Sequence, residues 1–150
     1  MSREKSTRDT VGRLLRDQQL GVLSTAGGKG PYASLVAFVV SDDERHLFFV
    51  TPRATRKFAN ITANAQVALL VNNSINHPQD FHQAAAVTAV GTASAVSPPD
   101  VKAVRERYLA KHPYLEDFAH SPSCEFVDIR VSRYIMVERF QNVSEYRVAP

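Results

Sequence analysis

Two short polar turns constrain the fold of this chain more than any other feature of its sequence. They span residues 26–30 and 41–45, and they separate three apolar segments rich in β-branched and aromatic residues, 20–25, 31–40 and 46–51. A crossover between parallel strands needs a dozen or more residues, so connections this short allow only antiparallel neighbours. The first half of the chain is therefore predicted to form an antiparallel sheet that begins with a glycine-rich hairpin.

Further strands are expected in the second half of the chain. They have the same apolar and β-branched composition and cover residues 66–72, 84–96 and 125–139, with 143–148 as a candidate seventh strand. Gly91 is expected to mark a bulge or bend in the fifth strand. A sheet of six or seven strands tends to curl and close, because closure removes exposed edges. The prediction is a mainly β fold, a small antiparallel β-barrel with peripheral helices.

Three helices are expected around this barrel. Residues 7–19 carry apolar side chains at helical spacing, and residues 55–62 form a second, shorter helical segment. The third helix is expected to begin at Ser97 as N-cap, with Pro98 at its first position, and to run to about Lys111. Residues 72–83 are expected to form a polar loop, and residues 114–123 a connector.

Length and composition favour one soluble domain over residues 1–150. The chain is 44% hydrophobic and 22% charged, which is ordinary globular usage, and no linker, repeat or low-complexity stretch divides it. Its one cysteine, Cys124, excludes a disulfide scaffold. No apolar run approaches the roughly 20 residues of a membrane helix, and the polar N-terminus does not match a signal peptide. A cytoplasmic protein without membrane association is expected.

The net charge of +3 says little about partners. Basic residues are interleaved with acids, and Phe38, Phe48 and Phe49 lie in apolar strands with few cations nearby. Nucleic-acid-binding barrels instead combine aromatic side chains with a basic face, so no nucleic-acid partner is expected. His77 and His82 share one loop, but their spacing fits no standard zinc pattern, and no metal site is expected.

The clearest chemical signal follows the third strand, which ends at Thr51. The next helix begins with Thr55, Arg56 and Lys57. Cations at a helix N-terminus oppose the macrodipole, which favours anions there. The arrangement becomes favourable when a phosphate binds, because backbone N–H groups, hydroxyls and cations then converge on it. On the residues alone, the alternative is that Arg53 and the two following cations simply point into water.

Taken in order, these residues resemble the FMN-binding split β-barrels of the pyridoxamine 5′-phosphate oxidase-like family. The resemblance covers about residues 10–140. It rests on the register Thr51…Thr55-Arg56-Lys57…Asn60…Asn64…Val67-Ala68-Leu69-Leu70. The later segment Arg107-Tyr108-Leu109-Ala110-Lys111-His112-Pro113 looks like the haem-utilisation branch of these barrels. The resemblance implies a split antiparallel β-barrel of the FMN-binding type.

The resemblance also implies a cofactor site. Arg56 and Lys57 would grip the FMN phosphate, Val50 and Thr51 would border the phosphate and ribityl chain, and residues 32–36 would lie along the isoalloxazine edge. A partner subunit would complete the site, which gives a homodimer with flavin at the interface. The implied cofactor-binding residues are Tyr32, Ala33, Ser34, Leu35, Val36, Val50, Thr51, Thr55, Arg56 and Lys57. No catalytic residue is assigned.

The apolar strands argue separately for a homodimer. Residues 36–40, 47–50 and 67–71 are apolar on both faces. A lone small barrel needs only its inner face apolar, so the outer faces require a cover. An isologous two-fold contact is the commonest way to supply one.

Two functions follow from the resemblance. The first is an FMN-dependent oxidoreductase that acts on an undetermined small molecule. The second is a module that holds flavin, haem or another cofactor without turnover. The chain has alanines at 84–86, where pyridoxamine phosphate oxidases place a glutamine, and no histidine follows His120, where the haem-utilisation branch uses one. These departures disfavour the vitamin B6 reaction and haem degradation.

Overall fold

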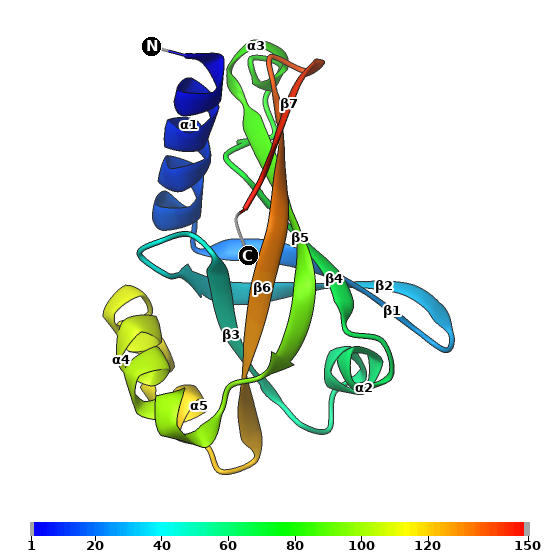
Figure 1. The fold of residues 1–150 in the computed structure, drawn as a ribbon, viewed down its shortest axis with the longest axis vertical. Coiled ribbons are helices and arrows are strands. Elements are labelled where there is room, and N and C mark those ends of the chain that lie inside the picture. Colours follow the sequence, from blue (N-terminus) through cyan, green and yellow to red (C-terminus); the bar gives the residue numbers. More distant parts are fainter. Residues whose placement is uncertain (1, 149–150) are drawn as a thin grey trace.

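The strands of the protein close into a ring. The computed structural model describes residues 2–148 and is shown in Figure 1. The sheet order is β3-β2-β1-β4-β5-β6-β7, all neighbours are antiparallel, and β3 also pairs with β6. The strands are β1 (Leu20–Gly27), β2 (Gly30–Val40), β3 (His46–Pro52), β4 (Gln66–Asn72), β5 (Ala85–Ala95), β6 (Cys124–Glu138) and β7 (Asn142–Arg147). The β3–β6 pairing closes an antiparallel barrel, so the predicted fold is confirmed.

The pairing of the long strand β6 closes the barrel, and a short β2–β3 ladder leaves a split in it. This strand of 15 residues runs beside β5 along most of its length. Its first half pairs with β3, and its second half pairs with β7, which extends the sheet beyond the ring. The β2–β3 ladder is short and joins only Phe38, Val39 and Val40 of β2 to β3. The barrel is therefore split between the first part of β2 and the end of β3.

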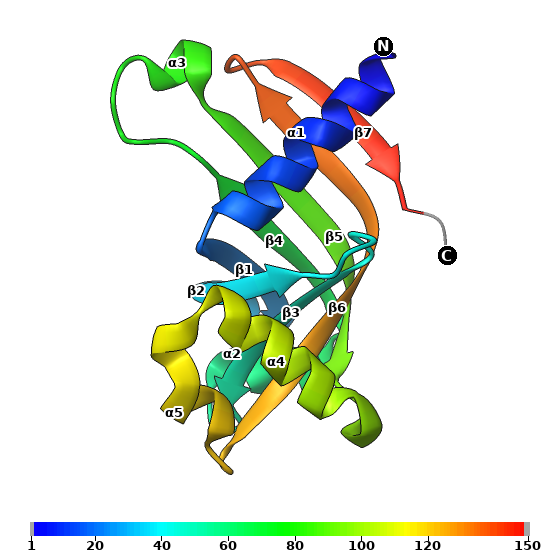
Figure 2. The same ribbon diagram turned by 90° about the vertical axis from the view of Figure 1, so that its left-hand side faces the viewer.

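Helices cover the barrel on several sides. They are α1 (Arg3–Asp17), α2 (Arg56–Ala63), α3 (Asp80–Gln83), α4 (Val101–Lys111) and α5 (Glu116–His120), with short 3₁₀ turns at Pro98–Asp100 and Pro113–Leu115. Figure 1 shows α2 and the α4–α5 pair on opposite sides of the lower half of the barrel. Figure 2 shows α1 across the upper half. No helix in residues 2–148 combines the length and apolarity needed to cross a membrane.

Three details of the helix prediction are wrong. The expected loop and the expected connector contain α3 and α5, which have only four and five residues and so leave no periodic apolar pattern to detect. Ser97 lies at the predicted N-cap position, but its side chain makes no capping hydrogen bond and the turn that follows is 3₁₀. The α-helix itself begins at Val101, three residues after the predicted first position at Pro98.

Two apolar clusters stabilise the fold. The main core fills the barrel and receives Val11, Leu14 and Leu15 from α1. A second cluster lies between α4–α5 and the outer side of β3, and it includes Val50 and Tyr108. Burial raises the pKa of Tyr108 to about 12. The helices of the same chain thus cover the second face of β3 and of the end of β2, which the sequence had assigned to a partner.

Two polar contacts fix α4 against the rest of the molecule. Lys111 Nζ donates to the Leu15 carbonyl at 3.0 Å and lies 4.1 Å from the centre of the Phe38 ring. Burial lowers the pKa of Lys111 to about 8. The buried His112 ring lies with Nε2 2.7 Å from the Phe38 carbonyl. The end of α4 is therefore tied to both α1 and β2.

A row of residues on the outer face of the sheet has no cover from residues 2–148. Leu35 pairs with Val22, Val22 with Leu70, Leu70 with Thr88, and Thr88 with Ile135, so the five share one face across five strands. Leu35 is 63% exposed and Leu70 is 38% exposed. This apolar row is the part of the sheet that still needs a partner.

Gly91 lies at the predicted irregularity, where the β5–β6 register shifts after Val90. A Cβ at position 91 would collide with the carbonyl oxygen of Arg130. Replacing Gly91 with alanine is expected to lower the free energy of unfolding by roughly 1–3 kcal/mol, because the strands must move apart. Thermal unfolding measures the loss, at roughly 2–4 °C per kcal/mol.

The matched control is Gly28→Ala, since a Cβ at Gly28 meets open space. Its melting temperature is expected to stay close to that of the wild type. A Gly91→Ala protein as stable as the wild type would show that the two strands tolerate separation at the bulge.

Candidate functional site

The start of α2 is held by two threonine hydroxyls. Thr55 is the N-cap residue, and its Oγ1 accepts from the Phe58 N–H at 3.3 Å. The Oγ1 atoms of Thr55 and the buried Thr51 lie 3.0 Å apart. These contacts join the end of β3 to the first turn of α2. The position of the helix start is therefore fixed relative to the barrel.

Two cations and two backbone donors remain free at this helix start. Among residues 2–148, Arg56 and Lys57 have no carboxylate partner, and their backbone N–H groups donate no hydrogen bond to the chain. Arg53 differs, because its Nε donates to Glu125 at 2.9 Å and its Nη1 to the Pro122 carbonyl at 2.8 Å. Of the three cations in the sequence signal, only Arg56 and Lys57 can meet an incoming anion without breaking an ion pair.

The β1–β2 hairpin lies against α2 and brings Tyr32 to the same place. Asn60 Nδ2 donates to Thr25 Oγ1 at 3.0 Å, and a Cβ at Gly27 would collide with the Asn60 side chain. The Arg56 guanidinium carbon lies 5.3 Å from the centre of the Tyr32 ring. Asn60 was part of the sequence register but received no role there, and the structure shows that it docks the helix on the hairpin.

The neighbouring part of β2 presents an open backbone edge. Residues 31–37 pair with β1 on one side, but the ladder to β3 begins only at Phe38. The Ser34 hydroxyl is buried and has no partner within residues 2–148. Buried polar groups are nearly always hydrogen-bonded, so an unpartnered hydroxyl beside unpaired backbone groups indicates a place where a polar ligand can bind.

The predicted site residues do not all face one another. Five of them lie around the start of α2: Tyr32, Thr51, Thr55, Arg56 and Lys57. The remaining residues diverge along their strands: Val36 is buried in the barrel core, Leu35 and Ala33 are exposed, and the side chain of Val50 belongs to the cluster under α4.

The residues at the start of α2 fit a phosphate group. The first turn of α2 carries no acidic residue, and it offers two backbone N–H groups and two cationic side chains, while the neighbouring Thr51 and Thr55 hydroxyls both contact the Pro52 carbonyl. Anions bind well at such a helix start, since the macrodipole and the free N–H groups act together. The open edge of β2 beside Ser34 offers donors and acceptors to the polar side of a flat ring.

A pocket lies on the other side of the barrel, between α4 and strands β3, β5 and β6. Its volume is about 400 Å³, and none of the ten predicted site residues lines it. His46 and Asp128 form a hydrogen bond in its wall, with 2.9 Å between Nδ1 and Oδ1. The two residues are 82 positions apart, so no local sequence pattern could have paired them.

Comparison with known proteins identifies the chain's relatives. The family model described as pyridoxamine 5′-phosphate oxidase matches residues 7–138. A search among curated proteins found no match.

Solved structures with the same fold include haem and flavin binders. A haem-binding protein from Mycobacterium smegmatis has a TM-score of 0.78 at 16% identity, over 90% of this chain and 55% of that one. HutZ, the haem storage protein of Vibrio cholerae, has 0.69 at 15%, over 91% and 92%. An FAD-binding protein from Mesorhizobium loti has 0.67 at 17%, over 91% and 94%. Identities this low show a shared fold.

Proposed function

The chain belongs to the pyridoxamine 5′-phosphate oxidase family, and from this premise we propose that it is an FMN-binding flavoprotein that oxidises or reduces an undetermined small molecule. The observation that carries the proposal is the set of free donors at the start of α2. Arg56, Lys57 and the backbone N–H groups of the first helical turn have no anionic partner within residues 2–148. A phosphate monoester is the group that these donors fit.

Each part of the site has a separate task in this proposal. Arg56 and Lys57 bind the phosphate, and Thr51 and Thr55 border it. The open edge of β2 and the Ser34 hydroxyl orient the flavin ring. When bound, the flavin supplies hydride or electron transfer, while the protein controls orientation, polarity and access.

We infer that the functional unit is a homodimer. The apolar row from Leu35 through Leu70 crosses the outer face of the sheet next to the strand assigned to the flavin. A second copy of the chain, related by a two-fold axis, would cover this row with the same row of its own. The flavin would then lie at the edge of the interface, where the partner can complete the site.

The test of the proposed function is optical. Protein purified from cells, or mixed with FMN and desalted, is expected to keep the visible absorption bands of a flavin. Those bands should bleach with NADH, NADPH or another reductant and return when a substrate is reduced. Protein that retains no FMN under either condition would overturn the proposal.

A binding module without turnover is the second candidate, favoured by the haem-binding and haem storage proteins among the structural neighbours. Four of the five histidines already make a ring hydrogen bond: His46 with Asp128, His112 with the Phe38 carbonyl, His120 with the Glu116 carbonyl, and His77 with the Gln79 N–H. Titration with haem separates the two candidates. A Soret shift that saturates at one haem per chain, in protein that does not bind FMN, would favour the haem module.

A further inference from the structure

The pocket beneath α4 has the size and shape of a small-molecule site. Its volume of about 400 Å³ lies within the range of ligand pockets, roughly 300–1,000 Å³. One wall of the pocket is the face of α4 that carries Ala103, Val104 and Arg107. Asp100, the residue just before the helix, continues this face, since the four residues follow the i, i+3, i+4, i+7 spacing. Strands β3, β5 and β6 form the opposite wall. Figure 1 places this region across the barrel from α2 and its proposed phosphate site.

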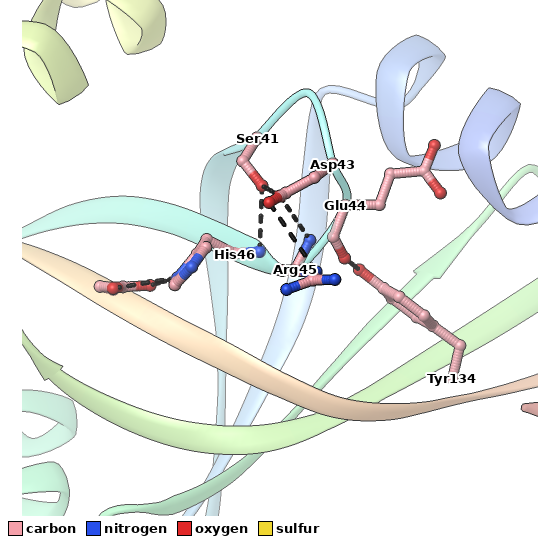
Figure 3. Close-up of polar contacts among 7 residues, drawn as sticks. Ser41, Asp43, Glu44, Arg45, His46 and Tyr134 are labelled. Carbon is pink, nitrogen blue, oxygen red and sulfur yellow. Dashed lines mark hydrogen bonds and ion pairs between the residues drawn. The ribbon is translucent and has the colours of Figure 1, made fainter. Parts of the chain in front are cut away.

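His46 is held rigidly in the strand wall. Its Nδ1 lies 2.9 Å and 3.1 Å from the two carboxylate oxygens of Asp128, and its ring is parallel to the Phe48 ring within 5°, with 6.0 Å between the centroids. Its backbone N–H donates to Ser41 Oγ at 3.1 Å, which fixes the start of β3 to the turn drawn in Figure 3. Nε2 has no partner in residues 2–148, so a fixed polar atom remains for a ligand.

Arg107 is fixed at the same end of the pocket. Its Nη1 donates to the Val40 carbonyl at 3.2 Å, and its Nη2 lies 3.0 Å from the Asp42 carboxylate. The Asp42 side chain is 90% exposed, so water screens this ion pair and the guanidinium keeps much of its attraction for another anion. A guanidinium has five donors, and those not used by the chain remain available.

The two ends of the pocket differ in charge. Arg107 lies at the end next to the β2–β3 turn, where His46 and the Asp128 carboxylate bonded to it also line the wall. Asp100 lies seven residues before Arg107, about 10 Å away along the helix axis. The apolar part of the lining is formed by Phe48, Ala95 and Val96 on the strand side and by Ala103 and Val104 of α4, and Ser94 and Ser97 add two hydroxyls. A ligand with one anionic end and an apolar body matches this order.

We propose that the pocket binds a small organic carboxylate. The carboxylate accepts hydrogen bonds from the Arg107 guanidinium, the His46 ring lies beside it, and the apolar body lies between Phe48 and the Ala103–Val104 face of α4. The site is separate from the proposed flavin site, and it would exist whether or not the protein binds FMN.

Benzoate is the probe that tests the proposal, with benzyl alcohol as its neutral counterpart. In an amide NMR titration of the full chain, benzoate should shift resonances of residues 46–48, 94–97 and 100–107, and benzyl alcohol should bind at least tenfold more weakly. Arg107→Met should weaken benzoate binding at least tenfold. Shifts that are absent from these segments, or equal affinity for the two probes, would overturn the proposal.

A second variant avoids dependence on Arg107, which also helps to hold the β2–β3 turn. Ala103 is exposed on α4 and lines the pocket, so Ala103→Trp should fill the space and abolish benzoate binding without disturbing the core. Ala110→Trp is the matched control, because Ala110 is exposed on the same helix but does not line this pocket. Benzoate binding that survives Ala103→Trp unchanged would place the probe elsewhere and contradict the assignment.

Discussion

Replacing either Arg56 or Lys57 with alanine is expected to weaken FMN binding roughly ten- to a hundredfold and to leave riboflavin binding unchanged. Each side chain would make a charge-assisted hydrogen bond to the phosphate, worth about 1.5–3 kcal/mol, and every 1.4 kcal/mol is about a tenfold change in dissociation constant. Riboflavin has no phosphate, so neither substitution should change its dissociation constant. Both side chains belong to the first turn of α2 and lie outside the core clusters, so the fold should persist.

The measurement is a titration of flavin fluorescence with FMN and with riboflavin. Lys102→Ala serves as a matched control, since Lys102 is an exposed lysine on α4, across the barrel from α2. FMN affinity that is unchanged in both the Arg56→Ala and the Lys57→Ala proteins would show that the phosphate binds elsewhere. Equal losses for FMN and riboflavin would instead indicate a distorted ring site.

Placing a carboxylate in the apolar outer row is expected to dissociate the proposed dimer. Leu70→Asp removes the burial of a leucine, worth about 1.5–3 kcal/mol, and leaves an unpaired charge facing an apolar surface. An isologous interface contains the substitution twice, so the dimer dissociation constant should rise at least about a hundredfold. FMN affinity should fall as well, because the partner subunit would no longer complete the site.

Sedimentation velocity at micromolar concentration measures this effect directly. The control is Tyr114→Asp, because Tyr114 is 96% exposed in a 3₁₀ turn away from the apolar row. A Leu70→Asp protein that stays dimeric would exclude this face as the interface. A monomeric variant with full FMN affinity would show that one chain forms the whole flavin site.

The proposed oxidoreductase depends on the geometry of the split in the barrel. Because β3 turns away from β2 below Phe38 to pair with β6, the backbone of residues 31–37 is left open on one side. The same divergence places the end of β3, and hence the start of α2, next to that open edge. The divergence of β3 from β2 therefore creates two neighbouring binding surfaces. The start of α2 suits the charged tail of a cofactor, and the open edge of β2 suits a flat polar ring.

Local patterns in the sequence determined most of the elements of this protein. The turns at residues 26–30 and 41–45 could only join antiparallel strands, and the predicted bounds of six strands differ from the observed ones by at most two residues at either end. The cations of the site were also visible, because Thr55, Arg56 and Lys57 are consecutive. α3 and α5 were missed, since helices of four and five residues owe their form to the elements that flank them.

Tertiary structure alone decided which of these side chains meet. Arg53 looked equivalent to Arg56 in the sequence, but it lies beside Glu125, 72 positions away, and is already paired. The side chain of Val50 is covered by α4, and His46 meets Asp128 across the β3–β6 ladder. These outcomes all follow from the closure of β3 onto β6, a contact between distant segments. The periodicity of apolar residues in the sequence indicates only which face of a strand is apolar. The closure of the barrel determines which other elements cover that face.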